Sequence, residues 1–455
     1  MFSFLTGTMA VGNQRFYSFY IGTGEKEKLR KVVGSTFFVY IILMAALVIL
    51  CETIGLWLLN HKLVIPPERM FAANVVFQVG VVSMGISLLQ APFLGLITAH
   101  ENMSIYAKMS VWDSVSRLLY LYLLLIIPFD KLILYSVLGM CIGLIGQAFY
   151  MWYCFRKYPE SHTGPVYDKL ILRELLGFNV WNLCGNFAWM LKNQGTGMLL
   201  NVFFGPAINA AQSIAGQVRG FSSIFANGLT TSVKPQITKN YASGEHDRMF
   251  RLTYSGGKIT YVLMAVVVIP AIFNIGIVLD LWLPVVPEYA VVFCQLMLIE
   301  VLIEEVGRIL STITQATGKI RNYQLIIGFL GALNIPVSFV FLKLGFNPAW
   351  VFAISIVCQL GVNAVRVIYL RKVKTGSVKE CLRELIIPCG LAALASGMVC
   401  FMFPSSSYLP IAVPVIILEI GVVLVFGYFI AFGPLERMMV KDYMGKIARY
   451  IKRTK

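Results

Sequence analysis

The sequence predicts an all-α polytopic membrane protein, made of two six-helix lobes related by an internal repeat and of an additional C-terminal helix pair. The first observation is composition, because 58% of the 455 residues are hydrophobic and only 13% are charged. A soluble domain could not cover that much apolar surface with polar groups. The second observation is a series of apolar runs that reach the roughly 20 residues a spanning helix needs. These runs are too long and too continuous for the strands of an outer-membrane barrel.

The third observation is the repeat itself. The segment IGTGEKEKLRK (Ile21–Lys31) recurs 220 positions later as YASGEHDRMFR (Tyr241–Arg251), and each copy opens into a long apolar run. A second pair of segments, Thr98–Tyr106 and Gln315–Tyr323, aligns at nearly the same offset. Internal repeats of this size in an apolar chain are typical of secondary transporters.

The N-terminal lobe is predicted to occupy residues 1–154. From residue 174, 67 residues precede the second copy of the repeat, enough for two spans, whereas only 20 residues precede the first copy. We therefore expect the first helix and part of the second to be missing, with residues 1–20 forming the cytoplasmic half of a helix and an intact protein of fourteen spans. Complete spans of this lobe are expected at residues 34–59, 71–97, 104–127 and 131–154.

A cytoplasmic linker, residues 155–173, is expected to join the N-terminal lobe to a C-terminal lobe at residues 174–371. An extra helix pair follows at residues 372–433. The tail, residues 434–455, mixes apolar and basic residues, so we predict an amphipathic helix on the anionic cytoplasmic leaflet. Together with the four spans above, this gives twelve complete spans, the later ones at residues 174–203, 206–235, 252–280, 288–316, 322–343, 347–371, 384–403 and 408–432.

The net charge of +16 is concentrated at alternate connections between the expected spans. The segments 26–31, 156–173 and 371–383 are rich in Lys and Arg, whereas residues 283–289 and 403–409 contain none. By the positive-inside rule, the basic connections and the C-terminus are cytoplasmic. The positive charge therefore indicates orientation in a membrane, and not binding of nucleic acid.

The stretch Phe178–Phe250, which begins FNVWNLCGNFAWMLKNQ and ends SGEHDRMF, resembles the polysaccharide flippases of bacterial surface-polysaccharide pathways, of the O-antigen and capsule type. Residues Phe2–Lys31 resemble the corresponding part of their first lobe. Those flippases share a superfamily with the multidrug and toxic-compound extruders and the lipid II flippases. The resemblance covers essentially the whole chain in helix order and loop charge, and the missing first helix departs from it.

The resemblance implies two lobes that rock between inward-open and outward-open states. The implied substrate is a polyprenyl-pyrophosphate-linked oligosaccharide, which moves from the cytoplasmic to the periplasmic leaflet for surface polysaccharide such as lipopolysaccharide. We expect a monomer whose other partners are membrane lipids, with proton or sodium coupling as an option.

Charged groups at bilayer depth are costly and therefore need a partner or a polar cavity. Arg117, Lys192 and Arg219 lie near the middle of their expected spans, and Arg15 lies near the cytoplasmic end of its helix. Because pyrophosphate is anionic and guanidinium offers a bidentate fork, we predict these four as substrate-binding residues. The alternative is that each cation neutralises a carboxylate and holds helices together, or, for Arg15, contacts a lipid phosphate.

Carboxylates accompany these cations at helical spacing. Asp113 precedes Arg117 by four residues, the favourable order for an ion pair within a helix, and Glu304 precedes Arg308 in the same way. Glu300, Glu304 and Arg308 share one helix face. We predict Glu300 as a carboxylate for cation coupling, with structural pairing of the whole group as the alternative.

Amides provide a further candidate site, because Asn179, Asn182, Asn186 and Asn193 follow one side of a helix. Asn182 and Asn186 are predicted to hydrogen-bond sugar hydroxyls. The alternative is hydrogen bonding between helices, worth under about 1 kcal/mol on average in membranes.

A membrane enzyme is the main rival from another functional class. The four histidines lie in or beside loops, and the sequence has no Gly-rich phosphate cradle, zinc-ligand spacing or nucleophile elbow. We expect no catalytic residue, cofactor or metal site. Among transporters, the alternative is a proton- or sodium-coupled multidrug exporter with a carboxylate-rich cavity, whereas three deep cations favour an anionic lipid-linked substrate.

Overall fold

The computed structural model describes residues 3–61, 67–374, 377–403 and 409–442. The chain is all-α over these ranges, as predicted, and divides into two compact units, Met1–Leu183 (unit 1) and Cys184–Lys455 (unit 2). The predicted lobe and linker boundaries stay a prediction. Most of the predicted tail helix lies outside the described residues, which end at residue 442.

Unit 1 is built from long helices joined by short turns. The π-helical turn Cys51–Gly55 links α2 to α3, so that these two helices form one continuous span. At the start of α6, the Asp130 carboxylate accepts hydrogen bonds from the backbone N–H groups of Leu132 and Ile133 at 3.0 and 3.2 Å, which caps the helix. The helices are α1 (Ser3–Thr23), α2 (Lys26–Leu50), α3 (Leu56–His61), α4 (Met70–Ala99), α5 (Met103–Ile126), α6 (Lys131–Lys157) and the first half of α7 (Lys169–Phe204), with 3-10 turns at Pro67–Arg69 and Pro159–His162.

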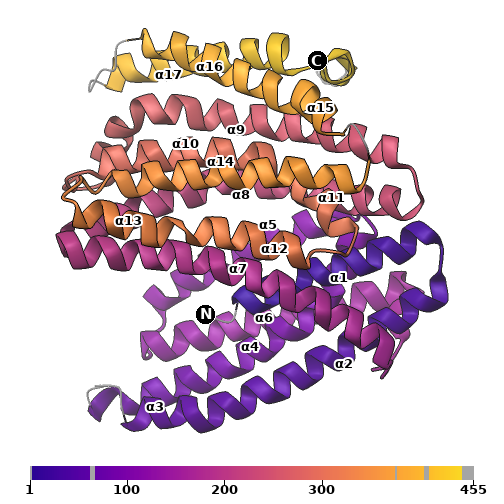
Figure 1. Cartoon of the computed structure of the whole chain (residues 1–455). Coiled ribbons are helices and arrows are strands. Elements are labelled where there is room, and N and C mark those ends of the chain that lie inside the picture. The colour runs from indigo at the N-terminus through magenta and orange to yellow at the C-terminus, as the bar shows by residue number, and fades with distance from the viewer. Residues whose placement is uncertain (1–2, 62–66, 375–376, 404–408, 443–455) are drawn as a thin grey trace, which may run out of the picture. The chain divides into compact units, whose positions relative to one another are not determined.

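Helix α4 is central in unit 1, where it packs against α1, α2 and α6 (Figure 1). Gly95 permits the close approach of α1, because a Cβ at that position would lie 3.1 Å from the Tyr17 ring and 3.2 Å from Asn13 Cβ. Asn13 Nδ2 in turn donates a hydrogen bond of 3.0 Å to the Tyr40 hydroxyl of α2. These contacts tie the first three long helices of the unit together.

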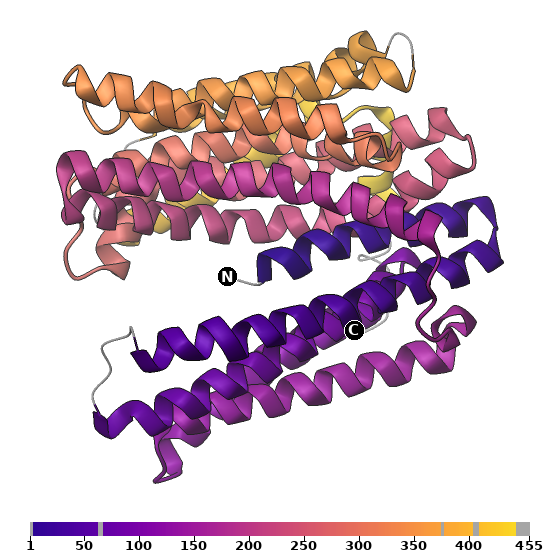
Figure 2. The ribbon, with the colours of Figure 1, turned by 60° about the horizontal axis from the view of Figure 1, so that its bottom comes forward.

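Unit 2 contains the second half of α7 and the remaining helices. Its long helices run nearly parallel or antiparallel to one another (Figures 1 and 2). They are α8 (Pro206–Ala242), α9 (His246–Trp282), α10 (Ala290–Arg308), α11 (Leu310–Ala316), α12 (Arg321–Ala332), α13 (Asn334–Lys343), α14 (Trp350–Tyr369), α15 (Ser377–Cys381), α16 (Ile387–Phe401) and α17 (Leu409–Phe426), with a 3-10 turn at Leu370–Lys372 and π turns at Leu382–Ile386 and Gly427–Ala431.

The core of unit 2 forms around α9 and α10. Helix α9 packs against α8, α10, α16 and α17, and its Phe250 and Met264 side chains are fully buried. On the opposite side of α10, the Phe293 and Phe352 rings pack with centroids 4.5 Å apart. Helix α10 is therefore enclosed by α8, α9 and α14, which places its polar side chains in the interior.

The two copies of the repeat adopt the same turn. In the first copy Gly24 has φ +75°, and in the second Gly244 has φ +78°, a conformation that glycine adopts at little cost. The N–H of Glu25 donates to the Tyr20 carbonyl at 3.2 Å, and the N–H of Glu245 donates to the Asn240 carbonyl at 2.9 Å. The offset is 220 positions in each case, so the sequence repeat is also a repeat of backbone geometry.

The twelve predicted spans are all helical within the described ranges, although several are divided by short 3-10 or π turns. Nine helical segments of those ranges are long and apolar enough to cross a membrane. The predicted spans 174–203, 206–235 and 288–316 are not among them, because α7, α8 and α10 carry more polar and charged residues. The count of twelve spans stays a prediction.

Candidate functional site

The polar helices of unit 2 converge on a buried network of charges. We use the name α10 network for three carboxylates of α10 and the three cations paired with them, from α7, α8 and α10. All three carboxylates belong to α10, and the spacing of four residues places Glu300 and Glu304 on one face of that helix. The members are Lys192, Arg219, Glu300, Glu304, Glu305 and Arg308.

Glu300 holds two cations at once. Lys192 Nζ of α7 lies 2.5 Å from Glu300 Oε1, and Arg219 Nη1 of α8 lies 3.0 Å from Glu300 Oε2. The Glu300 and Lys192 side chains are 2% and 6% exposed, so water screens this contact little. Lys192 and Arg219, which were both expected near the middle of their spans, therefore contact the same carboxylate.

A second branch of the network runs through Glu304. Arg219 Nη2 donates to Glu304 Oε2 at 2.6 Å, and Arg308 Nη2 donates to Glu304 Oε1 at 3.2 Å. The predicted pair of Glu304 and Arg308 is therefore present. Arg308 Nε also lies 3.1 Å from Glu305 Oε2, without the alignment of a hydrogen bond. Arg219 thus bridges two carboxylates with its two terminal nitrogens.

Two further cations flank the α10 network. Arg366 of α14 donates to the Glu304 carbonyl at 3.5 Å and to Asn363 Oδ1 at 3.2 Å. Lys234 of α8 lies close enough to Glu305 to interact with it electrostatically. Among the residues that the structure describes, five cations thus surround three carboxylates. In the same ranges, no group of His, Cys, Asp and Glu side chains is placed to hold a metal ion.

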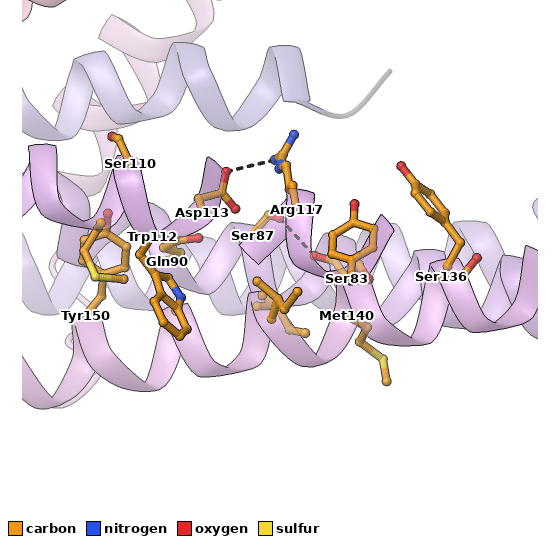
Figure 3. A pocket seen from close by; sticks show the side chains of 18 residues that line it. Ser83, Ser87, Gln90, Ser110, Trp112, Asp113, Arg117, Ser136, Met140 and Tyr150 are labelled. Atoms are coloured by element: carbon orange, nitrogen blue, oxygen red, sulfur yellow. Dashed lines mark hydrogen bonds and ion pairs between the residues drawn. The ribbon is translucent and has the colours of Figure 1, made fainter. Parts of the chain in front are cut away.

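The other predicted deep pair lies in unit 1. Arg117 Nη2 lies 3.1 Å from Asp113 Oδ2, one turn earlier on α5, as the spacing predicted. These side chains are 66% and 54% exposed, in contrast to the α10 network. They line a cavity of about 520 Å³ between α4, α5 and α6, which Figure 3 shows together with Ser87, Gln90 and Ser136.

The remaining predicted binding residues are Arg15, Asn182 and Asn186. The Arg15 guanidinium lies over the rings of Phe16 and Phe178 at 4.5 and 5.4 Å from their centroids, within cation–π distance. Asn182 is buried in unit 1, whereas Asn186 is exposed in unit 2. Their predicted role in substrate binding stays a prediction.

Sequence reasoning missed the polar lining of the unit 1 cavity. The signal is present, because Ser83, Ser87 and Gln90 recur at steps of four and three residues on α4. Ser110, Asp113 and Arg117 do the same on α5. Each stripe marks one face of a helix, and two polar faces in an apolar chain indicate a shared cavity. Arg366 and Lys234 were not among the predicted binding residues.

An ion pair outside the spans fixes the end of α4. The imidazole of His100 contacts the Glu160 carboxylate and stacks on Tyr158, with ring centroids 4.3 Å apart. Burial by itself would raise the pKa of the Glu160 carboxyl, but the hydrogen bond with His100 and the charge of Arg30 hold that pKa below its ordinary value. The Glu160 side chain is therefore ionised at neutral pH.

No protein-family model and no curated protein matches the sequence. Solved structures of MATE and MOP superfamily transporters do match the fold. MATE in the straight conformation matches with a TM-score of 0.72 at 12% identity, over 83% of this chain and 85% of that chain. A MOP superfamily transporter from Pyrococcus furiosus gives 0.70, and an outward-facing multidrug resistance MATE family transporter 0.71, each at 13% identity over the same shares. The chain therefore has a MATE-like, multi-pass membrane transporter fold.

Proposed function

We propose that this chain is a secondary transporter, and not an enzyme, that flips a polyprenyl-pyrophosphate-linked oligosaccharide across a bacterial inner membrane by alternating access. The likeness to MATE and MOP superfamily structures supports the transporter part. In this proposal the lobes, residues 1–154 and 174–371, rock around the substrate while its polyprenyl tail stays in lipid. The basic connections and the C-terminus face the cytoplasm, as the distribution of Lys and Arg indicates.

The observation that supports an anionic substrate is the balance of charges around α10. The five cations of the α10 network and its flanks outnumber the three carboxylates by two, counted among the described residues. A partly buried excess of positive charge is costly unless an anion can enter. A pyrophosphate headgroup carries negative charge and several acceptor oxygens, and it therefore complements this site.

Competition between the headgroup and Glu300 provides a mechanism. Arg219 presents two nitrogens to Glu300 and Glu304, and the same fork can hold two phosphate oxygens. When the headgroup binds Arg219 and Lys192, Glu300 loses its partners, and a proton or sodium ion at Glu300 would compensate for that loss. Coupling to an ion gradient then follows from the exchange of partners at one carboxylate.

The other predicted residues take secondary roles in this proposal. Arg15 would meet the headgroup or a lipid phosphate near the cytoplasmic face, and Asn182 and Asn186 would hydrogen-bond sugar hydroxyls. Asp113 and Arg117 would act in the unit 1 cavity, which they line.

Cation-coupled export of drugs is the second candidate function. It is favoured by the match to a protein described as a multidrug resistance MATE family transporter and by the carboxylates Glu300 and Glu304. The pocket of the Pyrococcus furiosus transporter is described as having reversed polarity, which is said to suggest a different function. By analogy, the sign of the charge excess is the property that separates the two candidates for this chain.

The test uses bacteria that lack their own flippase and express this chain, with surface polysaccharide and drug resistance scored side by side. Restored polysaccharide without drug resistance supports the flippase, and drug resistance alone refutes it in favour of the exporter. Arg219→Lys, which keeps the charge but not the fork, should reduce transport at normal abundance. Arg219→Gln, which also removes the counter-charge of Glu300 and Glu304, should abolish transport and lower abundance as well. Arg248→Gln is the matched control, because that arginine is 69% exposed and pairs only locally with Glu245.

A further inference from the structure

The cavity of unit 1 is polar although its helices are apolar. It lies between α4, α5 and α6, and its volume of about 520 Å³ falls in the range of roughly 300 to 1,000 Å³ that small-ligand pockets have. Four serines, three tyrosines, one glutamine and one ion pair line it. Polar groups at bilayer depth are retained where they serve a ligand, a pathway or a partner.

The serine hydroxyls have their own protons already engaged. Ser83 Oγ donates to the Val79 carbonyl at 2.7 Å, and Ser136 Oγ donates to the Leu132 carbonyl at 2.9 Å. Ser87 and Ser110 also donate to the carbonyl four residues earlier in their helices. A hydroxyl that donates in this way retains lone pairs as acceptors. The serines therefore present acceptors to the cavity.

Donors and an aromatic face complete the lining. The Arg117 guanidinium and the Gln90 amide supply N–H donors, while the Asp113 carboxylate adds a strong acceptor (Figure 3). Trp112, which is 46% exposed, supplies an apolar ring surface next to them. Because Asp113 and Arg117 neutralise each other at 3.1 Å, the lining has no net charge. An anion or an organic cation would have to break that pair.

Three glycines of α6, which have no side chain, leave the space of the unit 1 cavity open. Gly139, Gly143 and Gly146 of α6 line the cavity at steps of four and three residues, and a Cβ at each would have no neighbour within 4 Å. The lining extends along α6 from Tyr135 to Tyr150, a distance of about 22 Å at the helical rise. The cavity is thus long enough for more than one ring of a linear ligand.

We propose that this cavity binds the saccharide portion of the transported substrate, as a site for neutral, hydroxyl-rich rings. Sugar hydroxyls both donate and accept, so they can use serine and Asp113 acceptors together with Arg117 and Gln90 donors, while the apolar ring face lies on Trp112. The inference rests on the proposed function, because it assigns a site to the saccharide portion of the proposed substrate.

The test is saturation-transfer difference NMR on the full chain in lipid nanodiscs, with free N-acetylglucosamine and glucose as probes. The wild-type chain should transfer saturation to the ring protons of at least one probe. Gly143→Leu fills the cavity without removing a polar group, and Gln90→Leu removes one donor. Each should weaken binding about tenfold, as expected for the loss of one or two hydrogen bonds. Gly177→Leu is the control, because this glycine of α7 is exposed and open but does not line the cavity.

Equal signals from wild type and Gly143→Leu, or no signal for either probe, would overturn the inference. Binding of tetraphenylphosphonium that is lost in Asp113→Asn, without any sugar signal, would also overturn it and would assign the cavity to organic cations. The cell assay separates this inference from the proposed function. If the wild-type chain and Gly143→Leu restore polysaccharide equally well, the saccharide site in the cavity is refuted and the flippase function is not. If the chain binds sugar but does not restore polysaccharide, the sugar site is supported and the flippase function is refuted.

Discussion

Glu300 is the position where a single substitution should cost most. Its carboxylate lies 2.5 Å from Lys192 and 3.0 Å from Arg219, and it is 2% exposed. At an effective dielectric constant near 20, each contact corresponds to about 6 kcal/mol of Coulomb attraction. Desolvation of the ions offsets much of that gain, but removing one partner leaves the others buried without compensation, at about 3 to 5 kcal/mol. Glu300→Gln should therefore lower the free energy of unfolding by that amount.

The assay is a double-mutant cycle with Lys192→Met, measured by SDS titration of the purified chain in mixed micelles. Lys192→Met with Glu300→Gln removes both charges of one pair and leaves Arg219 with Glu304 at 2.6 Å. The double variant should then be more stable than the sum of the single variants predicts, by about 1 to 3 kcal/mol. Asp113→Asn is the control, because its pair is more than half exposed and should contribute less than about 1 kcal/mol.

Additive effects of Lys192→Met and Glu300→Gln would refute this reasoning, because they would mean that the two side chains do not depend on each other. A cost of Glu300→Gln no larger than that of Asp113→Asn would refute it as well. That result would show that water reaches the carboxylate and screens its charge.

Four other substitutions, which make three predictions, test the fold by the same titration. Glu160→Gln should cost about 1 to 3 kcal/mol at pH 7, and the difference should shrink as the pH falls below about 4, since a carboxyl with a lowered pKa stabilises the folded state only while it is ionised. Gly24→Ala and Gly244→Ala should each cost about 1 to 2 kcal/mol, because both glycines have φ near +75° to +78°. Phe352→Ala should cost about 3 to 5 kcal/mol, because it empties a buried contact with Phe293.

Each of these three has a clear contrary result. A Glu160→Gln difference that persists unchanged at pH 3 would mean that its carboxylate charge does not stabilise the fold. If Gly24→Ala and Gly244→Ala lower the free energy of unfolding by different amounts, the two repeat turns, although alike in backbone conformation, adjust differently to the added Cβ. A small effect of Phe352→Ala would mean that the side chains around it collapse into the space.

The fold was predictable because its signals are local. Apolar runs place most helix boundaries within a few residues, and the GEKEK and GEHDR segments predict turns at the same offset as the observed ones. The ion pairs of Asp113 with Arg117 and Glu304 with Arg308 were also predictable, because both partners lie one turn apart on one helix. Contacts such as Lys192 with Glu300, 108 positions apart, depend on how helices pack, and spacing along the chain carries no such information.

The α10 network explains how three polar helices can remain in an apolar chain. Helices α7, α8 and α10 fall short of the apolarity expected of a spanning helix, and they are the helices that bring Lys192, Arg219 and Glu300 together. Removing the Glu300 carboxylate should therefore destabilise these helices in the membrane and should also affect substrate binding. Loss of transport in a Glu300 variant could then have either cause. Arg219→Lys separates them, because it keeps the charge that Glu300 and Glu304 require but removes the fork that holds two oxygens at once. Normal abundance of Arg219→Lys with reduced transport would then indicate weaker substrate binding, because the positive charge that neutralises Glu300 and Glu304 is still present.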